Sequence, residues 1–146
     1  MAPTAPAASP TSSRRWLALA LIAAAQFMVI MDTSIIGVAL PKLQADLGFD
    51  PQDLSWVFNA YVVAFGGLLL LGGRLSDLFG ARRIFTTGWT VLAAGSLVAG
   101  LANEVAVELT GRALQGAGSA LIAPAALTLL FQVFGGSDEL PKALAL

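Results

Sequence analysis

The sequence predicts an all-α protein that crosses a membrane several times, and three observations support this fold class. First, 57% of its 146 residues are hydrophobic and only 12% are charged, whereas a soluble domain is about 45–50% apolar and about 25% charged. Second, the apolar residues form long runs, each near the roughly 20 residues that a helix needs to span a bilayer. Third, Lys and Arg gather at alternate ends of these runs, as expected for a membrane protein.

The composition also excludes several classes of function. The net charge is -1, so the chain lacks the basic surface that displaces counterions from nucleic acid. Cysteine and histidine are both absent, which removes disulfides, thiolate chemistry and most zinc sites. The sequence contains no evident nucleophile–base pair, metal cluster or phosphate-binding loop. We therefore expect no enzyme activity, no metal and no cofactor.

The chain begins with residues 1–15, which are rich in Pro, Ala, Ser and Thr. Such a segment has too little apolar surface to fold, so we expect a disordered N-terminus. The first apolar run follows at about 16–40. A signal peptide is the alternative, but the run is too long for one, contains Asp32 and lacks a small-residue cleavage site. Pro41 is expected to end this helix.

The remaining spans are expected at about 54–73, 84–102 and 105–134. The second should begin as a helix near Pro51, because Asp50 suits the N-cap position and Asp53 would face the positive end of the helix dipole. The last residues, SDELPKALAL, are typical of a polar loop followed by the start of a fifth helix. We expect residues 16–146 to form part of a longer membrane domain.

The basic residues predict the orientation of the chain. Those on one side of the predicted spans are Arg14, Arg15, Arg74, Arg82, Arg83 and Lys142, whereas the other side has only Lys42. Lys and Arg collect in cytoplasmic segments. The N-terminus is therefore expected in the cytoplasm, and the protein is expected to be a multi-pass protein of the cell membrane.

Asp32 stands inside the first apolar run, where inserting a charge costs about 3 kcal/mol or more. Ionisable groups at such positions face the protein interior or a wet cavity. A carboxylate there can carry a proton, because burial favours its neutral form, or it can contact a cation. The alternative is a buried hydrogen-bonding group that only fixes helix packing.

The stretch GGRLSDLFGARRIF is expected to form a short cytoplasmic loop after the second span. Gly72 and Gly73 would end that span and allow another helix to approach closely. Gly80 would allow a tight turn. Asp77 would form charge-assisted hydrogen bonds with the arginines around it, and such bonds can break and re-form. A plain basic loop is the alternative, but the ordered spacing is more specific than a charge run.

Arg112 lies inside the fourth apolar run. The small or polar residues on its face of the helix and on the adjacent face are Gly111, Gln115, Gly116, Gly118 and Ala120. Small residues allow close helix contact. Glu108, four residues earlier, could pair with Arg112 within the helix. The other hypothesis is that Arg112 holds or releases a neighbouring proton carrier.

Asp32 and Arg112 are expected at the same depth in the membrane. Each lies about eight residues from the outer end of its span, which corresponds to roughly 12 Å at 1.5 Å per residue. If the first and fourth spans are neighbours, the two side chains can therefore face one cavity.

Three motifs together resemble the major facilitator superfamily, and most closely its fourteen-helix drug:proton antiporter branch. The motif MDTSIIGVALP matches at Asp32, Val38, Ala39, Leu40 and Pro41, and departs at Ser34 and Gly37. The loop motif matches at Gly73, Leu75, Asp77, Gly80, Arg82 and Arg83, with Leu78 and Ala81 where basic residues are common. The fourth-span motif matches at Arg112, Gln115, Gly116, Gly118 and Ala120.

The resemblance implies the first four transmembrane helices of a major facilitator N-terminal bundle, which would rock against a second bundle around a central cavity. It implies proton coupling or cavity contacts for Asp32, Arg112 and Gln115. It implies gating, meaning control of the switch between the two open states, for Gly73, Asp77, Gly80, Arg82 and Arg83. It implies helix packing for Gly116, Gly118 and Ala120.

The function implied by the resemblance is proton-coupled efflux of small, hydrophobic, drug-like molecules, with antibiotic resistance as its consequence. The implied partners are protons, the lipid bilayer and the remaining helices of a full-length transporter. Two alternatives stay open, namely a symporter or uniporter of small metabolites, and a truncated membrane protein without transport of its own. The antiporter-specific motif would belong to the fifth helix, beyond this chain.

Overall fold

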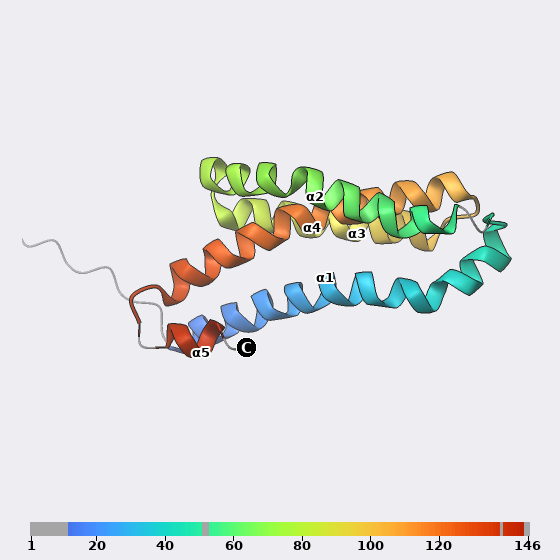
Figure 1. Cartoon of the computed structure of the whole chain (residues 1–146). Helices are drawn as coiled ribbons and strands as arrows, with labels where there is room; N and C mark the ends of the chain where they lie inside the picture. The colour runs from blue at the N-terminus through green and yellow to red at the C-terminus, as the bar shows by residue number, and fades with distance from the viewer. Residues whose placement is uncertain (1–11, 51–52, 138, 145–146) are drawn as a thin grey trace, which may run out of the picture.

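The computed structural model describes residues 12–50, 53–137 and 139–144, and these residues form helices joined by short connections (Figure 1). The helices are α1 (Ser12–Leu47), α2 (Leu54–Phe79), α3 (Ala81–Gly100), α4 (Val105–Phe134) and the short α5 (Leu140–Leu144). No strand occurs in these described ranges. The predicted all-α fold class is therefore confirmed.

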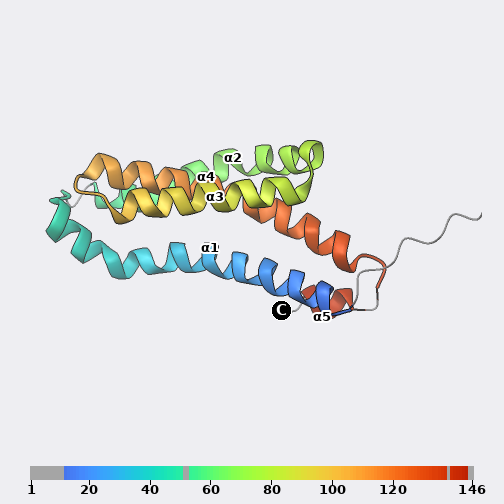
Figure 2. The ribbon, with the colours of Figure 1, turned by 180° about the vertical axis from the view of Figure 1, so that it is seen from behind.

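The four long helices of the described chain do not contribute equally to the packing. Helices α2 and α3 both pack closely against α4, which is the most buried of the set. Helix α1 runs alongside this group, as both views show, and α5 lies beside the first turns of α1 (Figures 1 and 2). Helix α4 therefore connects the other elements, and the residues on its inner faces decide how they fit together.

Glycines allow the close packing of α3 on α4. A Cβ atom at Gly88 would lie 2.8 Å from the backbone oxygen of Gly118, and one at Gly95 would lie 2.7 Å from the backbone nitrogen of Gln115. Real side chains do not fit at such distances, so the two backbones can approach only because these side chains are absent. The face of α4 toward α2 is similar, since Gly116 lies against the backbone of Tyr61.

The first helix begins earlier and ends later than the sequence predicts. Residues 1–11 of the predicted disordered segment lie outside the described residues, but residues 12–15 already belong to α1. Arg15 explains this start: its Nε donates to the carbonyl of Val133 at 3.0 Å, and its guanidinium lies 5.0 Å from the ring centroid of Phe134. The C-terminal end of α4 thus holds the beginning of α1.

The prediction that Pro41 ends the first helix is wrong, because α1 continues through Pro41 to Leu47. A proline removes one backbone hydrogen bond and bends a helix without always ending it. The turns around Pro41 are kept in place by packing, since a buried cluster is centred on Ile36, Phe49 and Val57. Tertiary contacts therefore outweigh the local preference.

Helix α2 is described from Leu54, after Asp53 as N-cap residue. Pro51, near which the sequence predicts the helix to begin, lies outside the described residues, so that start stays a prediction. The Asp53 side chain makes no capping hydrogen bond. The backbone carbonyl of Asp50 accepts hydrogen bonds from the backbone N–H groups of Asp53 and Leu54, at 2.9 and 3.2 Å. The backbone carbonyl of Asp50 therefore satisfies N–H groups that an acidic side chain was expected to cap.

The predicted cytoplasmic loop is mostly helical. Helix α2 continues to Phe79, so Gly73 and Asp77 lie within it, and Arg82 and Arg83 lie in the first turn of α3. Only Gly80 interrupts the helices, with a φ of +91° that side-chain-bearing residues rarely adopt. The second span and the part of the motif up to Phe79 thus form one continuous helix that is longer than a bilayer requires.

Among the described residues, three helices are long and apolar enough to cross a membrane, namely α1, α2 and α4. Many of their large apolar side chains point outward, for example Leu70, which is 84% exposed, and Val38, which is 81% exposed. Helix α3 carries Arg82 and Arg83 in its first turn and does not meet the same criterion. Its assignment as a further span remains a prediction.

Candidate functional site

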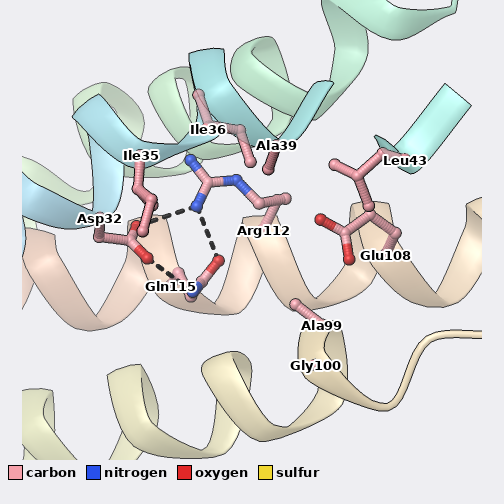
Figure 3. A pocket seen from close by; sticks show the side chains of 10 residues that line it. All are labelled: Asp32, Ile35, Ile36, Ala39, Leu43, Ala99, Gly100, Glu108, Arg112 and Gln115. Atoms are coloured by element: carbon pink, nitrogen blue, oxygen red, sulfur yellow. Dashed lines mark hydrogen bonds and ion pairs between the residues drawn. The ribbon is translucent and has the colours of Figure 1, made fainter. Parts of the chain in front are cut away.

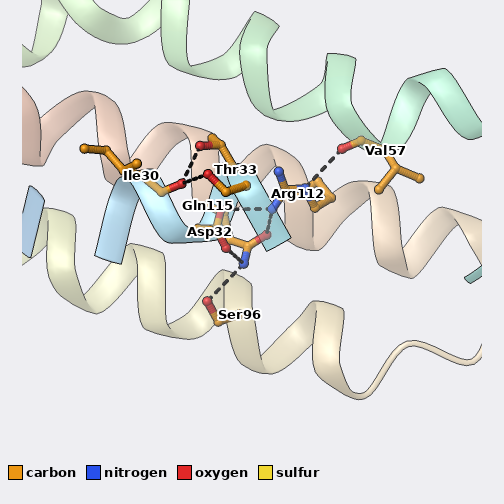
Figure 4. Close-up of polar contacts among 8 residues, drawn as sticks. Ile30, Asp32, Thr33, Val57, Ser96, Arg112 and Gln115 are labelled. Carbon is orange, nitrogen blue, oxygen red and sulfur yellow. Dashed lines mark hydrogen bonds and ion pairs between the residues drawn. The ribbon is translucent and has the colours of Figure 1, made fainter. Parts of the chain in front are cut away.

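An ion pair between α1 and α4 lies at the centre of the site. Arg112 Nη1 is 2.9 Å from Asp32 Oδ2 (Figure 4). The Arg112 side chain is 2% exposed and that of Asp32 is 16% exposed. The depth estimate from the sequence placed these two residues at one level, and the contact confirms that they meet. Each charge is thereby neutralised in a place where water is scarce.

Gln115 joins both members of the pair. Its Nε2 donates to Asp32 Oδ1 at 2.7 Å, and its Oε1 accepts a hydrogen bond from Arg112 Nη1 at 2.9 Å. The same Nε2 also donates to Ser96 Oγ of α3 at 3.0 Å. Gln115 lies one turn after Arg112, and this spacing places both side chains on the same face of α4. The result is a closed triangle of Asp32, Arg112 and Gln115.

Helix α2 contributes a backbone carbonyl and an aromatic ring to the arginine. Arg112 Nε donates to the carbonyl oxygen of Val57 at 3.0 Å, and its Cζ lies 4.9 Å from the ring centroid of Tyr61. A cation over an aromatic face is stabilised by the quadrupole of the ring. The remaining nitrogen, Nη2, is buried without a hydrogen-bond partner. The four long helices of the described chain therefore all contact one polar network.

A cavity of about 280 Å³ opens beside this network (Figure 3). It is lined by Asp32, Ile35, Ile36, Ala39, Leu43, Ala99, Gly100, Glu108, Arg112 and Gln115. Most of these side chains are apolar or small, so the charged groups are its main polar features. A small cavity of this kind can admit water and a proton to the carboxylates.

Glu108 does not form the intrahelical ion pair that the sequence allows. Arg112 bonds Asp32 instead, and no ion pair joins Glu108 to Arg112 in the described part of the chain. Glu108 is nevertheless only 3% exposed. It is a second acid that lines the same cavity.

The other predicted motif is far from this network. Asp77 follows Val57 by 20 residues along α2, which is about 30 Å at 1.5 Å per residue. Among the described residues Asp77 forms no ion pair with Arg74, Arg82 or Arg83, and all four side chains are exposed. The predicted charge-assisted bonds are therefore absent from these described helices.

The packing residues of the fourth-span motif lie at helix contacts. Gly116 and Ala120 face α2, where Ala120 lies against Gly72, and Gly118 faces Leu92 of α3. The prediction that Gly72 allows close approach is confirmed by this contact. Gly73 makes only ordinary contact, since a Cβ atom there would lie 3.9 Å from Pro124.

Sequence reasoning missed Ser96, Tyr61 and the carbonyl of Val57. A single serine or tyrosine in an apolar helix is common and gives no signal by itself. A backbone carbonyl has no residue-specific signal at all. Among the described residues, no group of three His, Cys, Asp or Glu side chains could hold a metal ion.

Long apolar helices around a buried ion pair define an integral membrane protein with a polar centre. The chain belongs to the Major Facilitator Superfamily, because the model of that family matches residues 22–146. The helices are thus part of the N-terminal bundle of a protein of this superfamily, as the sequence predicts.

Relatives within this family carry names that refer to antibiotics. The chain is 49% identical over 129 residues to the cephamycin export protein CmcT of Amycolatopsis lactamdurans, covering 88% of this chain and 26% of that protein. It is 46% identical over 130 residues to the puromycin resistance protein pur8 of Streptomyces alboniger, covering 89% and 26%. It is 40% identical over 119 residues to the lincomycin resistance protein of Streptomyces lincolnensis, covering 82% and 25%. The chain thus spans about a quarter of the length of these relatives.

Proposed function

We propose that this chain is the N-terminal part of a proton-coupled drug efflux transporter of the fourteen-helix branch. The observation that carries the proposal is the ion pair of Asp32 and Arg112, buried between α1 and α4 in a chain of a transporter family. The names of the relatives support the substrate class, since they refer to export of cephamycin and to resistance to puromycin and lincomycin. Small, drug-like antibiotics are therefore the substrates to test first.

The ion pair suggests how a proton could drive movement. Protonation of Asp32 would remove its charge and with it most of the attraction to Arg112, which is strong where water is scarce. Arg112 would keep its bonds to Val57 and Gln115, both of which lie outside α1. The contact of α1 with α4 would weaken, while the packing of α4 against α2 and α3 would persist. Such a selective loosening is a means of switching between two packed states.

The cytoplasmic end of the bundle would carry the gate in this proposal. Gly73 and Asp77 lie in the C-terminal part of α2, Gly80 lies in the turn, and Arg82 and Arg83 lie in the first turn of α3. The charged side chains among them are exposed. Exposed charges there are free to contact a second bundle when it approaches. The remaining helices of the transporter would supply this partner, as alternating access needs two halves that move around a central site.

The proposal also covers the orientation of the protein in the cell membrane. Arg14 and Arg15 precede the first span, and Arg74, Arg82 and Arg83 lie between the second and the third. This distribution supports a cytoplasmic N-terminus in a multi-pass protein of the cell membrane. The bilayer and protons are then its partners, and we infer transport without enzymatic chemistry.

The proposal is tested with the complete transporter reconstituted in proteoliposomes that contain a pH-sensitive dye. Puromycin, lincomycin and a cephamycin are added separately, with no pH gradient imposed at the start. We expect at least one of them to cause proton movement that the dye reports, and an imposed pH gradient to drive accumulation of that drug. Drug movement that does not depend on the pH gradient would contradict the proton coupling. If none of the three drugs moves, the proposed efflux of these antibiotics is contradicted.

A further inference from the structure

Glu108 is a buried acid for which the ion pair of Asp32 and Arg112 leaves no partner. It is 3% exposed and lies four residues before Arg112, in the first turn of α4. Figure 3 shows it on the side of α4 that carries Arg112, and it lines the same cavity of about 280 Å³. No side-chain hydrogen bond or ion pair engages its carboxyl group in the described part of the chain.

The charges around this cavity do not balance without a proton. From α1 the cavity receives Asp32, and from α4 it receives Glu108 and Arg112. From α2 the nearest titratable group is the neutral phenol of Tyr61, and α3 contributes only Ala99 and Gly100 to the lining. Two acids thus share one guanidinium. Because an unpaired carboxylate in such a largely apolar cavity is unfavourable, we expect one of the two acids to hold a proton.

We propose that Glu108 holds this proton, and that Arg112 alternates between Asp32 and Glu108 as the proton passes from one acid to the other. The inference rests on the proposed function of this site and extends it by a second proton-carrying residue. In the state described here Arg112 is paired with Asp32, so the proposal assigns the proton to Glu108.

The exchange balances in atoms and in charge. The O–H bond of Glu108 breaks and an O–H bond forms on Asp32, with water in the cavity that both residues line carrying the proton between them. The guanidinium of Arg112 then leaves Asp32 and pairs with the Glu108 carboxylate. The net charge of the three residues is the same before and after the transfer, so no uncompensated charge is left in the bilayer.

Three features of the structure suit Arg112 and Glu108 to this exchange. Side chains at positions i and i+4 of a helix are neighbours, so Arg112 can reach Glu108 by a change of side-chain conformation. Its Nη2 is buried without a partner, so the present network does not use all of its donors. The N-terminal end of α4 also favours a negative charge, which supports the ionised form of Glu108 once the proton has left.

The position of Glu108 along α4 gives a direction to the relay. Glu108 is one turn nearer than Arg112 to the start of α4, which is about 6 Å along the axis. In the proposed orientation this start faces the outside of the cell. A proton from outside would then reach Glu108 first and Asp32 second.

The test is infrared difference spectroscopy on the complete transporter in lipid nanodiscs, recorded between neutral and alkaline pH without drug. The wild type should show the C=O band of one protonated carboxylic acid that disappears as pH rises. Glu108→Gln should abolish this band, whereas Glu104→Gln, which alters an exposed acid just before α4, should leave it unchanged. A band that persists in Glu108→Gln would overturn the proposal.

A second variant keeps the test decisive if Glu108→Gln does not fold. In Asp32→Asn only one acid remains for one guanidinium, so Glu108 should be ionised and the band should also be lost. A band that survives in Asp32→Asn would overturn the proposal. This readout is independent of transport: a wild type that shows the predicted bands but moves no drug contradicts the proposed function alone, and proton-coupled transport with an unaltered band in Glu108→Gln contradicts this inference alone.

Discussion

The guanidinium of Arg112 lies 2.9 Å from the carboxylate of Asp32, across 80 residues of sequence. The contact joins α1 to α4 and is the only ion pair between those two helices in the described part of the chain. Apolar contact also holds α1 in place, as Ala25 is fully buried against Leu92 and Ile122. The ion pair therefore acts together with apolar packing along α1, including that of Leu19 and Ile36, to fix the position of this long helix.

Replacement of Asp32 by Asn should uncouple drug movement from the pH gradient. The amide keeps the size of the carboxyl group but cannot carry a proton, so the coupling step is lost while the helices still pack. We expect accumulation of drug driven by a pH gradient to fall to the level of empty proteoliposomes. Asp46→Asn is the matched control, because Asp46 pairs with Lys42 on the exposed surface, where such pairs contribute about 0–1 kcal/mol. If gradient-driven accumulation persists in Asp32→Asn, Asp32 serves helix packing and not proton coupling.

Replacement of Arg112 by Lys should preserve the charge but not the network. An ammonium group can approach Asp32, yet it cannot also donate to the carbonyl of Val57 and to Gln115 in the geometry of a planar guanidinium. A hydrogen bond to a charged group contributes about 1.5–3 kcal/mol, so we expect a loss of roughly that size in the free energy of unfolding. Denaturation of the complete transporter in detergent measures it. An unchanged midpoint in Arg112→Lys would show that only the charge matters.

Much of the central site could be predicted because it contains charged residues within otherwise apolar sequence. Asp32 and Arg112 are conspicuous in apolar runs, and helix geometry relates their depths. Ser96 and the carbonyl of Val57 were missed because nothing in their sequence context is unusual. The ends of the helices were predicted less well: Pro41 does not end α1, and α2 extends to Phe79. A hydropathy pattern predicts which residues lie in the lipid, whereas the end of a helix depends on its backbone hydrogen bonds and its packing.

A methyl group added at Gly95 should separate α3 from α4. The new Cβ atom would lie 2.7 Å from the nitrogen of Gln115 and 2.9 Å from the oxygen of Gly111, and neither backbone atom can move alone. Overpacking of this kind costs about 1–3 kcal/mol. Gly66→Ala is the control, because no atom lies within 4 Å of its added Cβ. Thermal unfolding of both variants in detergent should show a lower melting temperature for Gly95→Ala only; equal melting temperatures would contradict the close packing.

Removal of the Arg15 side chain should loosen the first turns of α1. Arg15 contacts the carbonyl of Val133, the ring of Phe134 and, at 3.8 Å, the carboxylate of Glu139. We expect Arg15→Ala to lower the protection of the backbone amides in the first turns of α1 against hydrogen exchange about fivefold, which corresponds to about 1 kcal/mol. Arg14→Ala is the control, since Arg14 is exposed and makes no such contact among the described residues. Similar exchange rates in the two variants would mean that α1 is held by its apolar contacts alone.

The 146-residue chain by itself should not transport drugs. Alternating access requires two bundles that move around a site between them, and the described helices surround the Asp32–Arg112 network as a single group. Proteoliposomes that contain only this chain should therefore accumulate no puromycin under a pH gradient, whereas those with the complete transporter should. Expression of this chain together with the remaining helices as a separate polypeptide should restore accumulation, because helix contacts and not chain continuity assemble the bundle. Robust accumulation by the chain alone would contradict both the need for a second bundle and the proposed mechanism.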